Sequence, residues 1–230
     1  MELSKRLEMI LENIDNCDNL VDVGTDHGYI PIEAIKRGIS KRAIASDINK
    51  DPLDKAKLNS IFEGVDESLE VRLGSGLETV KVGEVDTIVI AGMGGNLIRD
   101  ILEEGKLKAE KAKNIILVPA QNPEVLREYL YTKGYEIIKE DLCFEDGIFY
   151  ELFKVKVNEK EKTELEDIYY EVSPLILRSK NPLMKDYLEE KIEKYNKIIN
   201  LINDESESAK ERKAFLNEKV SILENMIKYC

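Results

Sequence analysis

Residues 19–31 have the sequence NLVDVGTDHGYIP, a short apolar run followed by a turn rich in glycine and aspartate. The run Asn19–Val23 has the length and composition of a buried strand. Gly24 permits a close backbone approach, and Gly28 leads into Ile30–Arg37, which has helical character. Because a strand that turns through glycine into a helix opens a doubly wound sheet, this stretch predicts an α/β fold.

The alternation of strand and helix continues on both sides of this stretch. Leu3, Leu7, Ile10 and Ile14 recur at helical spacing behind Ser4, a candidate helix cap. Further apolar runs, each closed by a turn residue, lie at Arg42–Ser46, Leu69–Leu73, Val85–Ala91 and Asn114–Val118. Helical segments separate or follow them at Pro52–Phe62, Asn96–Glu104 and Pro123–Lys133. This order predicts five parallel strands with helices on both faces.

The pattern changes at Tyr135. Tyr135–Phe144 and Ile148–Val157 are extended runs joined by a Glu-Asp-Gly turn, which predicts an antiparallel hairpin. A sheet of five parallel strands that ends in such a hairpin resembles the Rossmann-like class I methyltransferase topology. Dehydrogenase domains continue with parallel strands instead.

A charged segment, Asn158–Thr163 (NEKEKT), predicts a boundary between a domain of residues 1–158 and a domain of residues 159–230. Beyond it, two apolar stripes with coiled-coil spacing flank the polar break Asn203–Ser208 and predict an antiparallel α-helical coiled-coil hairpin. The stripes are Leu188, Ile192, Tyr195, Ile199 and Ile202, then Leu216, Val220, Leu223 and Ile227. Such spacing mainly indicates that the two helices pack against each other. The polar faces can also contact a partner, through Lys180, Lys185, Lys191, Lys194, Lys197, Lys210, Arg212 and Lys213.

The composition limits the classes of function. A formal net charge of −12 argues against nonspecific coating of nucleic acid, although 34 basic residues can still form one positive face. The first residues are charged, and no apolar stretch approaches the roughly 20 residues that a membrane span needs, so a cytoplasmic protein is expected. Cys17, Cys143 and Cys230 are scattered and His27 is the only histidine, which predicts neither disulfides nor a metal site.

Acidic residues close the first two predicted strands. Asp22 and Asp26 would repel a pyrophosphate, and they suit the sulfonium and ammonium groups of S-adenosyl-L-methionine. Asp47 follows the glycine turn by about twenty residues, where a carboxylate accepts both ribose hydroxyls. A helix cap is the alternative interpretation of both Asp26 and Asp47.

Two glycine-rich turns follow later strands. Gly74-Ser75-Gly76 would lie where an adenine ring binds, or it forms no more than a tight turn. The stretch IAGMGG, residues 90–95, brings the backbone close to a cofactor or a substrate, and an anion nest is the competing interpretation.

Four stretches resemble the bacterial TrmK family of tRNA (adenine-22-N1)-methyltransferases. They are DVGTDHGYIP (22–31), ASDINKDPL (45–53), RLGSGLE (72–78) and VDTIVIAGMGGNLIRDILEEG (85–105). The resemblance implies S-adenosyl-L-methionine as cofactor, S-adenosylhomocysteine as product and tRNA as partner. It also implies a cofactor pocket lined by Asp22, Gly24, Asp26, His27, Asp47, Ile48, Ser75, Gly76, Ala91, Gly92 and Met93. One departure concerns the family's Q-P-N after the fifth strand, where this chain has Val118-Pro119-Ala120 and then Gln121-Asn122-Pro123.

Transfer of a methyl group to adenine N1 requires positioning more than proton transfer, because the ring nitrogen attacks with a lone pair in the base plane. The base must be extruded, and Tyr29 and Asn122 are the candidates to hold it. His27 either fixes the loop geometry or transfers a proton.

Other functions stay open at this point. A small-molecule or protein methyltransferase would use the hairpin for dimerisation, and a noncatalytic protein would bind S-adenosyl-L-methionine without turnover. An NAD-dependent oxidoreductase is disfavoured by the missing G-x-G-x-x-G fingerprint. We expect a monomer or a weak dimer.

Overall fold

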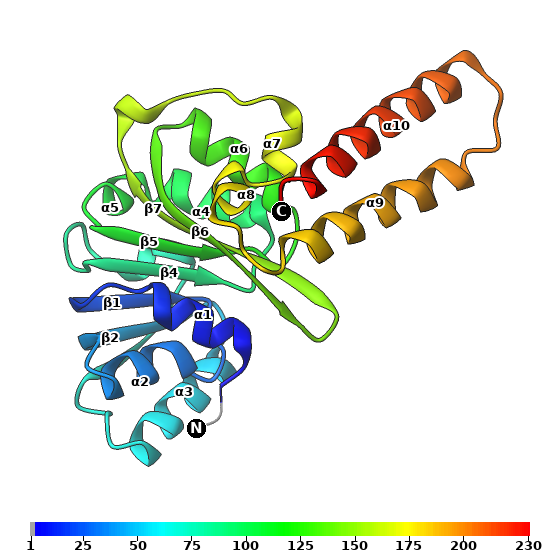
Figure 1. The fold of residues 1–230 in the computed structure, drawn as a ribbon. Helices are drawn as coiled ribbons and strands as arrows, with labels where there is room; N and C mark the ends of the chain where they lie inside the picture. Colours follow the sequence, from blue (N-terminus) through cyan, green and yellow to red (C-terminus); the bar gives the residue numbers. More distant parts are fainter. Residues whose placement is uncertain (1–2) are drawn as a thin grey trace. The chain divides into compact units, whose positions relative to one another are not determined.

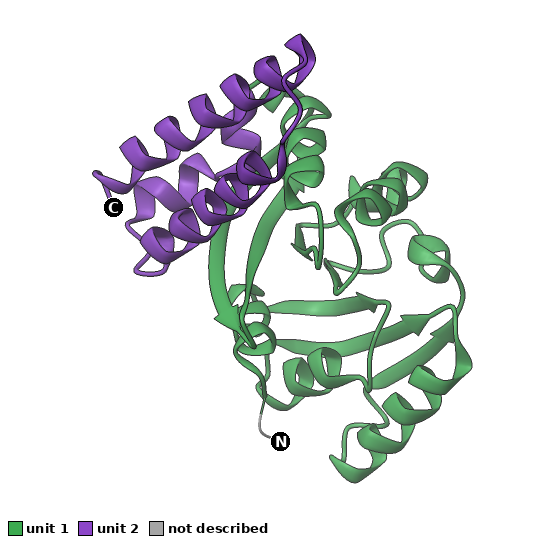
Figure 2. Ribbon diagram, turned by 90° about the vertical axis from the view of Figure 1, so that its right-hand side faces the viewer, with its two compact units in different colours: residues 1–166 green, residues 167–230 purple. Residues whose placement is uncertain are grey.

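The computed structural model describes residues 3–230 and divides into two compact units. The first extends to Glu166 and the second comprises Asp167–Cys230 (Figure 2). No helix within residues 3–230 is both long enough and apolar enough to cross a membrane.

The first unit contains a seven-stranded sheet of order β3-β2-β1-β4-β5-β7-β6 (Figure 1). Five strands run parallel, and β7 pairs antiparallel with both β5 and β6. The predicted Rossmann-like sheet with its terminal hairpin is therefore confirmed. The strands are β1 (Cys17–Val23), β2 (Ser40–Asp47), β3 (Leu69–Leu73), β4 (Thr87–Ala91), β5 (Asn114–Val118), β6 (Tyr135–Glu145) and β7 (Ile148–Val157).

Alternate residues of the central strands enter two separate cores, as the period of two in a strand requires. In β1, Leu20 joins the core beneath α1 and α2, while Val21 and Val23 join the core beneath α4 and α6. The helices of this unit are α1 (Lys5–Asn13), α2 (Tyr29–Lys36), α3 (Lys50–Phe62), α4 (Gly95–Glu104), α5 (Lys106–Ala109) and α6 (Pro123–Thr132), with short 3-10 turns η1 (Gly76–Thr79) and η2 (Glu159–Glu161). Helices thus cover both faces of the sheet.

Residues 159–166 belong to the first unit, whereas the charge pattern assigned them to the second. The reason is local hydrogen bonding. The Thr163 amide donates to the Tyr131 carbonyl at 3.0 Å, and Glu159 pairs with Lys106 at 3.0 Å. A charged segment is polar enough to end a domain, but these contacts keep it on the surface of the sheet unit.

The second unit consists of two short helices and two long ones. They are α7 (Asp167–Glu171), α8 (Pro174–Ser179), α9 (Met184–Leu201) and α10 (Glu207–Ile227). The long helices lie side by side (Figure 1). Of the residues in the predicted stripes, Leu188, Leu216, Val220 and Leu223 are buried. Met226 is buried in place of the predicted Ile227, which is half-buried.

Candidate functional site

The carboxyl ends of β1, β2 and β4 meet at one edge of the sheet. Val23 is aligned with Ser46 on one side and with Ile90 on the other. Strand order reverses between β1 and β4, and ligands of doubly wound sheets bind at such a switch point. The turns that follow these strands therefore form one site, as their spacing predicts.

Gly24 is the tightest point of the first turn. Its φ is +75°, and a Cβ added there would lie 2.1 Å from the Met93 methyl group. The amides of Gly24 and Thr25 donate to the Ser46 carbonyl at 2.8 and 2.9 Å, which ties the turn to β2. Glycine is favoured here because φ lies in the left-handed region, and any side chain would also displace the end of the Met93 side chain.

Asp22 lies beneath this turn and is only 4% exposed. Burial raises the pKa of its carboxyl from 3.8 to about 6. The Thr25 hydroxyl acts in the opposite direction, whereas the nearby carboxylates of Asp47 and Asp26 raise this pKa further. Three neighbouring carboxylates, of which Asp22 is buried, thus create a negative potential that favours a cationic ligand.

Asp26, His27 and Tyr29 form a surface group above Asp22. Asp26 is 81% exposed, and its Oδ1 lies 3.3 Å from His27 Nε2. The His27 ring stacks on Tyr29, with centroids 5.3 Å apart. Helix α2 starts behind Gly28, and no side chain caps it, so Asp26 is not its cap.

The backbone of His27, like its ring, contacts neighbouring elements. His27 has a φ of 58°, and its carbonyl accepts a hydrogen bond from the Asn59 side chain at 2.9 Å. A histidine in the left-handed region is uncommon, and here its neighbours on α2 and α3 fix it. These contacts support a role in setting the position of Tyr29.

Asp47 ends β2 and turns its carboxylate toward the next helix. Its Oδ1 accepts a hydrogen bond from the Asn49 amide at 2.6 Å, whereas Asn49 itself is the N-cap residue of α3. The Oδ1 atom of Asp47 is thus engaged in a hydrogen bond within the protein. The other oxygen keeps its acceptor capacity for a ligand.

Two hollows open at this edge of the sheet and share Gly24, Asp47 and Met93. The larger, of about 630 Å³, is lined by Ser4, Arg6, Leu7, Ile10, Asp22, Gly24, Asp26, Tyr29, Ile30, Asp47, Ala91, Gly92, Met93, Glu145 and Asp146. The smaller, of about 290 Å³, is lined by Val23, Gly24, Asp47, Ile48, Gly74, Ser75, Gly76, Met93, Leu97, Asp100, Ile101 and Glu104. An elongated ligand fits such a pair, with one end in each hollow.

The structure brings together all but one of the residues predicted to bind a cofactor. The exception is His27, which lines neither hollow and lies behind Tyr29. Ile48 is 66% exposed and gives the smaller hollow an apolar wall.

The glycines after β4 have two different roles. Gly92 has a φ of +79° and lines the larger hollow. Gly95 instead permits contact within the protein, because its amide donates to the Gln121 carbonyl at 2.7 Å and an added Cβ would lie 2.2 Å from the Asn122 carbonyl oxygen. Gly92 is thus placed where a cofactor or a substrate could approach it, whereas Gly95 packs against the loop after β5.

Asn122 is exposed and lines neither hollow. It has a φ of 54° and precedes α6, without a side-chain bond to that helix. The loop after β5 thus lies against the glycine loop, and the Ala120 amide donates to the Met93 carbonyl at 2.8 Å.

Helix α1 and the β6–β7 turn contribute a wall of the larger hollow that the sequence pattern does not predict. The Lys5 amide donates to Glu145 at 2.6 Å, which joins the start of α1 to that turn. Arg6 lines the larger hollow, with its guanidinium 5.0 Å from the centre of the Tyr150 ring. Nothing in the spacing of these residues predicts their approach, since it depends on the antiparallel hairpin crossing beside α1.

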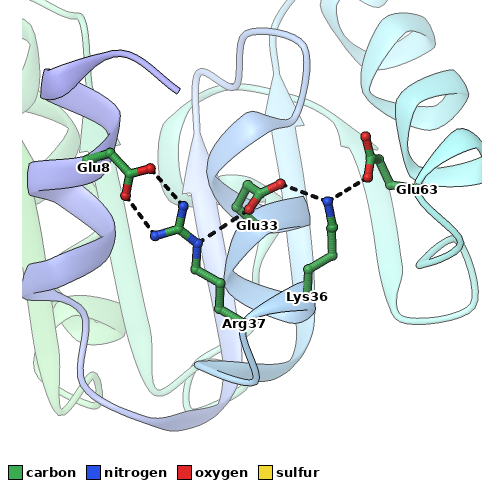
Figure 3. A network of polar contacts seen from close by, with 5 residues as sticks. All are labelled: Glu8, Glu33, Lys36, Arg37 and Glu63. Carbon is green, nitrogen blue, oxygen red and sulfur yellow. Dashed lines mark hydrogen bonds and ion pairs between the residues drawn. The ribbon is translucent and has the colours of Figure 1, made fainter. Parts of the chain in front are cut away.

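A chain of ion pairs holds α1 in place (Figure 3). Both Arg37 Nη atoms bond to Glu8 of α1, at 2.7 and 2.8 Å, and Arg37 Nε reaches Glu33 at 3.3 Å. Lys36 then links Glu33 to Glu63 at the end of α3, at 3.0 and 2.6 Å. The wall that α1 adds to the site is thereby tied to α2 and α3.

Within the described part of the chain, no group of three or more His, Cys, Asp or Glu side chains is arranged to hold a metal ion. Asp22, Asp26 and Asp47 all line the larger hollow.

Comparison with known proteins places this site in a family. The TrmK family model, described as tRNA (adenine(22)-N(1))-methyltransferase, matches residues 20–225. The chain is 32% identical to the tRNA (adenine(22)-N(1))-methyltransferase of Bacillus subtilis strain 168 over 238 residues, or 99% of this chain and 98% of that protein.

Solved structures agree with the sequence comparison. A Streptococcus pneumoniae Sp1610 structure with bound S-adenosyl-L-methionine is 31% identical, with a TM-score of 0.86 over 98% of this chain and 100% of that one. M. capricolum TrmK in complex with S-adenosyl-homocysteine is 30% identical, with a TM-score of 0.83 over 99% and 100%.

Proposed function

Because the chain belongs to the TrmK family of tRNA (adenine(22)-N(1))-methyltransferases, we propose that it transfers a methyl group from S-adenosyl-L-methionine to N1 of adenine 22 in tRNA. The observation that carries this proposal is the pair of hollows that meet at Gly24, Asp47 and Met93, with three carboxylates around their junction. A cationic ligand with a nucleoside at one end and an amino acid at the other matches that arrangement.

The side chains present fit the two ends of the cofactor. Asp22 and Asp26 face the larger hollow and would pair with the ammonium group, while Asp47 at the junction would accept the ribose hydroxyls. Arg6 would pair with the carboxylate of the amino-acid end, because it is the arginine on that wall.

The nucleoside end would occupy the smaller hollow. Ile48 and Leu97 offer apolar contact to the adenine ring, and Ser75 is exposed at the rim, where its hydroxyl can bond to the edge of the ring. Gly76 has a φ of +47° and packs against Ile101, so it places Ser75 rather than contacting the ring through a side chain. Gly24, Ala91, Gly92 and Met93 complete the wall between the two ends.

When bound, S-adenosyl-L-methionine supplies an electrophilic methyl group on a sulfonium. The N1 lone pair of the target adenine forms the new bond to carbon as the bond to sulfur breaks, and positive charge passes to the adenine ring. No proton has to leave, so the residues of the site need to align the base, exclude water and stabilise a cation. Asp22, Asp26 and Asp47 supply the negative potential for that last task.

Tyr29 is the residue placed best to hold the extruded base. It lines the larger hollow next to Asp22 and Asp26, and the His27 ring stacks against its other side. An aromatic face of this kind contributes about 1–3 kcal/mol to the binding of a base. We assign His27 to positioning Tyr29, and Asn122 to an outer contact with the RNA beyond the hollow.

The partner in this proposal is tRNA, and the reaction would take place in the cytoplasm. Because the chain has a net charge of −12, binding of an RNA requires that lysine and arginine side chains cluster on one part of the surface.

The proposal is tested by transfer of labelled methyl from S-adenosyl-L-methionine to an unmodified tRNA transcript, followed by nucleoside analysis. We expect 1-methyladenosine as the product, and none from a transcript in which adenine 22 is replaced by guanine. Asp47→Ala should abolish transfer and weaken cofactor binding in calorimetry, because the ribose hydroxyls lose their acceptor. Asp54→Ala, which removes an exposed carboxylate of α3, is the matched control and should be neutral.

Two results would contradict the proposal. Cofactor binding without any methylation of tRNA would favour a small-molecule or protein substrate, or a protein that binds the cofactor without turnover. Unchanged cofactor affinity in Asp47→Ala would remove the ribose assignment while leaving the reaction itself standing.

A further inference from the structure

The second unit has a hollow of its own, of about 510 Å³, which falls in the size range of small-ligand sites. It lies among α7, α8 and the last turns of α10 and is lined by Tyr169, Leu177, Arg178, Lys180, Ile222, Asn225, Met226 and Tyr229. Two tyrosines, three apolar side chains and two cations make up most of this set. No acidic side chain is part of it, although the chain as a whole is strongly acidic.

The two cations of this hollow differ from most others in the second unit. Along the long helices, Lys185, Lys194, Lys197, Lys210 and Lys219 each lie within ion-pair distance of a glutamate in the same unit. Within the described residues, neither Arg178 nor Lys180 has such a partner. Both side chains are exposed, and their charge is free to meet an anion.

The backbone at Lys180 adds a second, independent observation. Lys180 ends α8 with φ 54° and ψ 42°, in the left-handed region where helix ends usually carry glycine. A lysine there costs about 1 kcal/mol relative to glycine. Strain of this kind is often found where a side chain serves a ligand.

The aromatic residues indicate which anion fits. Tyr229 is 82% exposed at the rim, and Tyr169 is half-buried, while Leu177, Ile222 and Met226 add apolar surface. A flat base that stacks on tyrosine, carried by a phosphate that pairs with Arg178 and Lys180, uses every part of this set. An acidic peptide would pair with Arg178 and Lys180, but its carboxylates would not stack on the two tyrosines.

We propose that this hollow binds an unpaired nucleotide of an RNA, at a site separate from the one that holds the target adenine. The inference rests on the proposed function in so far as that RNA is the tRNA substrate. Its role is to anchor the substrate, so it contributes to affinity and not to the chemical step.

The test uses the full chain and two probes, a short single-stranded oligoribonucleotide and the unmodified tRNA transcript. Tyr229→Ala should weaken oligonucleotide binding about tenfold, as loss of one stacked base does, and Tyr229→Phe should restore it. The double variant Arg178→Ala/Lys180→Ala should weaken binding and lower the dependence of log affinity on log salt by about two. With tRNA, both changes should raise KM and leave kcat unchanged.

The matched control is Arg212→Ala/Lys213→Ala, which removes two cations of α10 that lie outside the hollow and have no ion pair within the described residues. It should leave oligonucleotide affinity unchanged. Because Tyr229 is mostly exposed, circular dichroism should show the same melting temperature for Tyr229→Ala as for the unaltered chain.

The outcomes separate this inference from the proposed function. Oligonucleotide binding that depends on Tyr229, without any methylation of tRNA, would overturn the proposed reaction and support the site. Methylation with an unchanged KM in every variant would contradict the nucleotide-binding hollow and would leave the proposed methyl transfer standing. Equal losses in the two double variants, or tighter Tyr229-dependent binding of a polyglutamate peptide than of the oligonucleotide, would also overturn the site.

Discussion

Asp22 is a buried acidic residue in the lining of the candidate site. Its carboxyl is almost fully buried, and its pKa of about 6 lies above the ordinary value of 3.8. The folded chain therefore binds this proton more tightly than the unfolded chain does. The stability that follows is complete below pH 3.8 and is lost as pH rises through about 6.

We expect Asp22→Asn to raise the free energy of unfolding at pH 7.5 by about 1–3 kcal/mol in the absence of cofactor, because it removes a buried charge. The same change should weaken cofactor binding about tenfold or more, since the ammonium loses a charged partner. Urea unfolding and calorimetry measure the two effects. In the unaltered chain, cofactor affinity should fall as pH drops below about 6, when Asp22 becomes protonated.

Asp18→Asn serves as the control, because Asp18 is an exposed carboxylate of the same strand. It should leave unfolding and cofactor affinity unchanged over this pH range. A less stable Asp22→Asn protein at pH 7.5 would mean that burial does not penalise the charge of Asp22 as described.

At the scale of elements, α1 is the least expected part of the site. It precedes the sheet in sequence, yet Ser4, Arg6, Leu7 and Ile10 line the larger hollow. Ser4 caps this helix as predicted, accepting a hydrogen bond from the Leu7 amide at 3.4 Å. The position of the helix depends on contacts with α2 and with the β6–β7 turn, which are distant in sequence.

We expect Arg37→Met to loosen α1 and to lower the free energy of unfolding by about 1 kcal/mol or less. The effect is small because the Arg37 and Glu8 side chains are 36% and 38% exposed, so water screens the pair. It should shrink further in high salt. Urea unfolding at low and high sodium chloride measures it.

Lys41→Met is the comparison, since the Lys41–Asp18 pair is 79% and 63% exposed and should contribute nothing measurable. If Arg37→Met and Lys41→Met behave alike, the ion-pair chain does not hold α1.

At the scale of the whole molecule, a buried ionic cluster joins the last helix of the sheet unit to its hairpin. Arg127 of α6 is 0% exposed, and its Nε donates to Glu140 of β6 at 2.8 Å. It also bonds to Glu151 of β7, and its guanidinium lies 4.7 Å from the centre of the Phe153 ring. One buried cation thus pairs with two buried carboxylates.

We expect Arg127→Met to lower the free energy of unfolding of the sheet unit by about 3–5 kcal/mol, because it removes the cation that pairs with two buried carboxylates. Thermal or urea unfolding measures this loss. The triple variant Arg127→Met/Glu140→Gln/Glu151→Gln should recover most of it, since no uncompensated charge remains. Should the triple variant stay as unstable as the single one, packing rather than charge would be the function of Arg127.

The order of the elements and the residues at the ends of the strands could be read from the amino-acid pattern alone. Those features follow from local rules: a period of two in strands, glycine at turns, and the carboxyl ends of parallel strands at one edge. The sequence could therefore place Asp22, Asp47 and Gly92 at the edge of the sheet where the larger hollow lies.

The remaining parts of the candidate site, and the boundary between the two units, follow from contacts between distant segments. The approach of Arg6 and Glu145, the contact of Gly95 with Asn122, and the burial of Arg127 all join segments far apart in sequence. The extent of the first unit through Glu166 depends on a hydrogen bond from Thr163 to α6 and an ion pair between Glu159 and α5, which the charge pattern does not reveal. The local sequence pattern predicts which face of a strand or helix a side chain lies on. The residues that it contacts there depend on how the elements pack against one another.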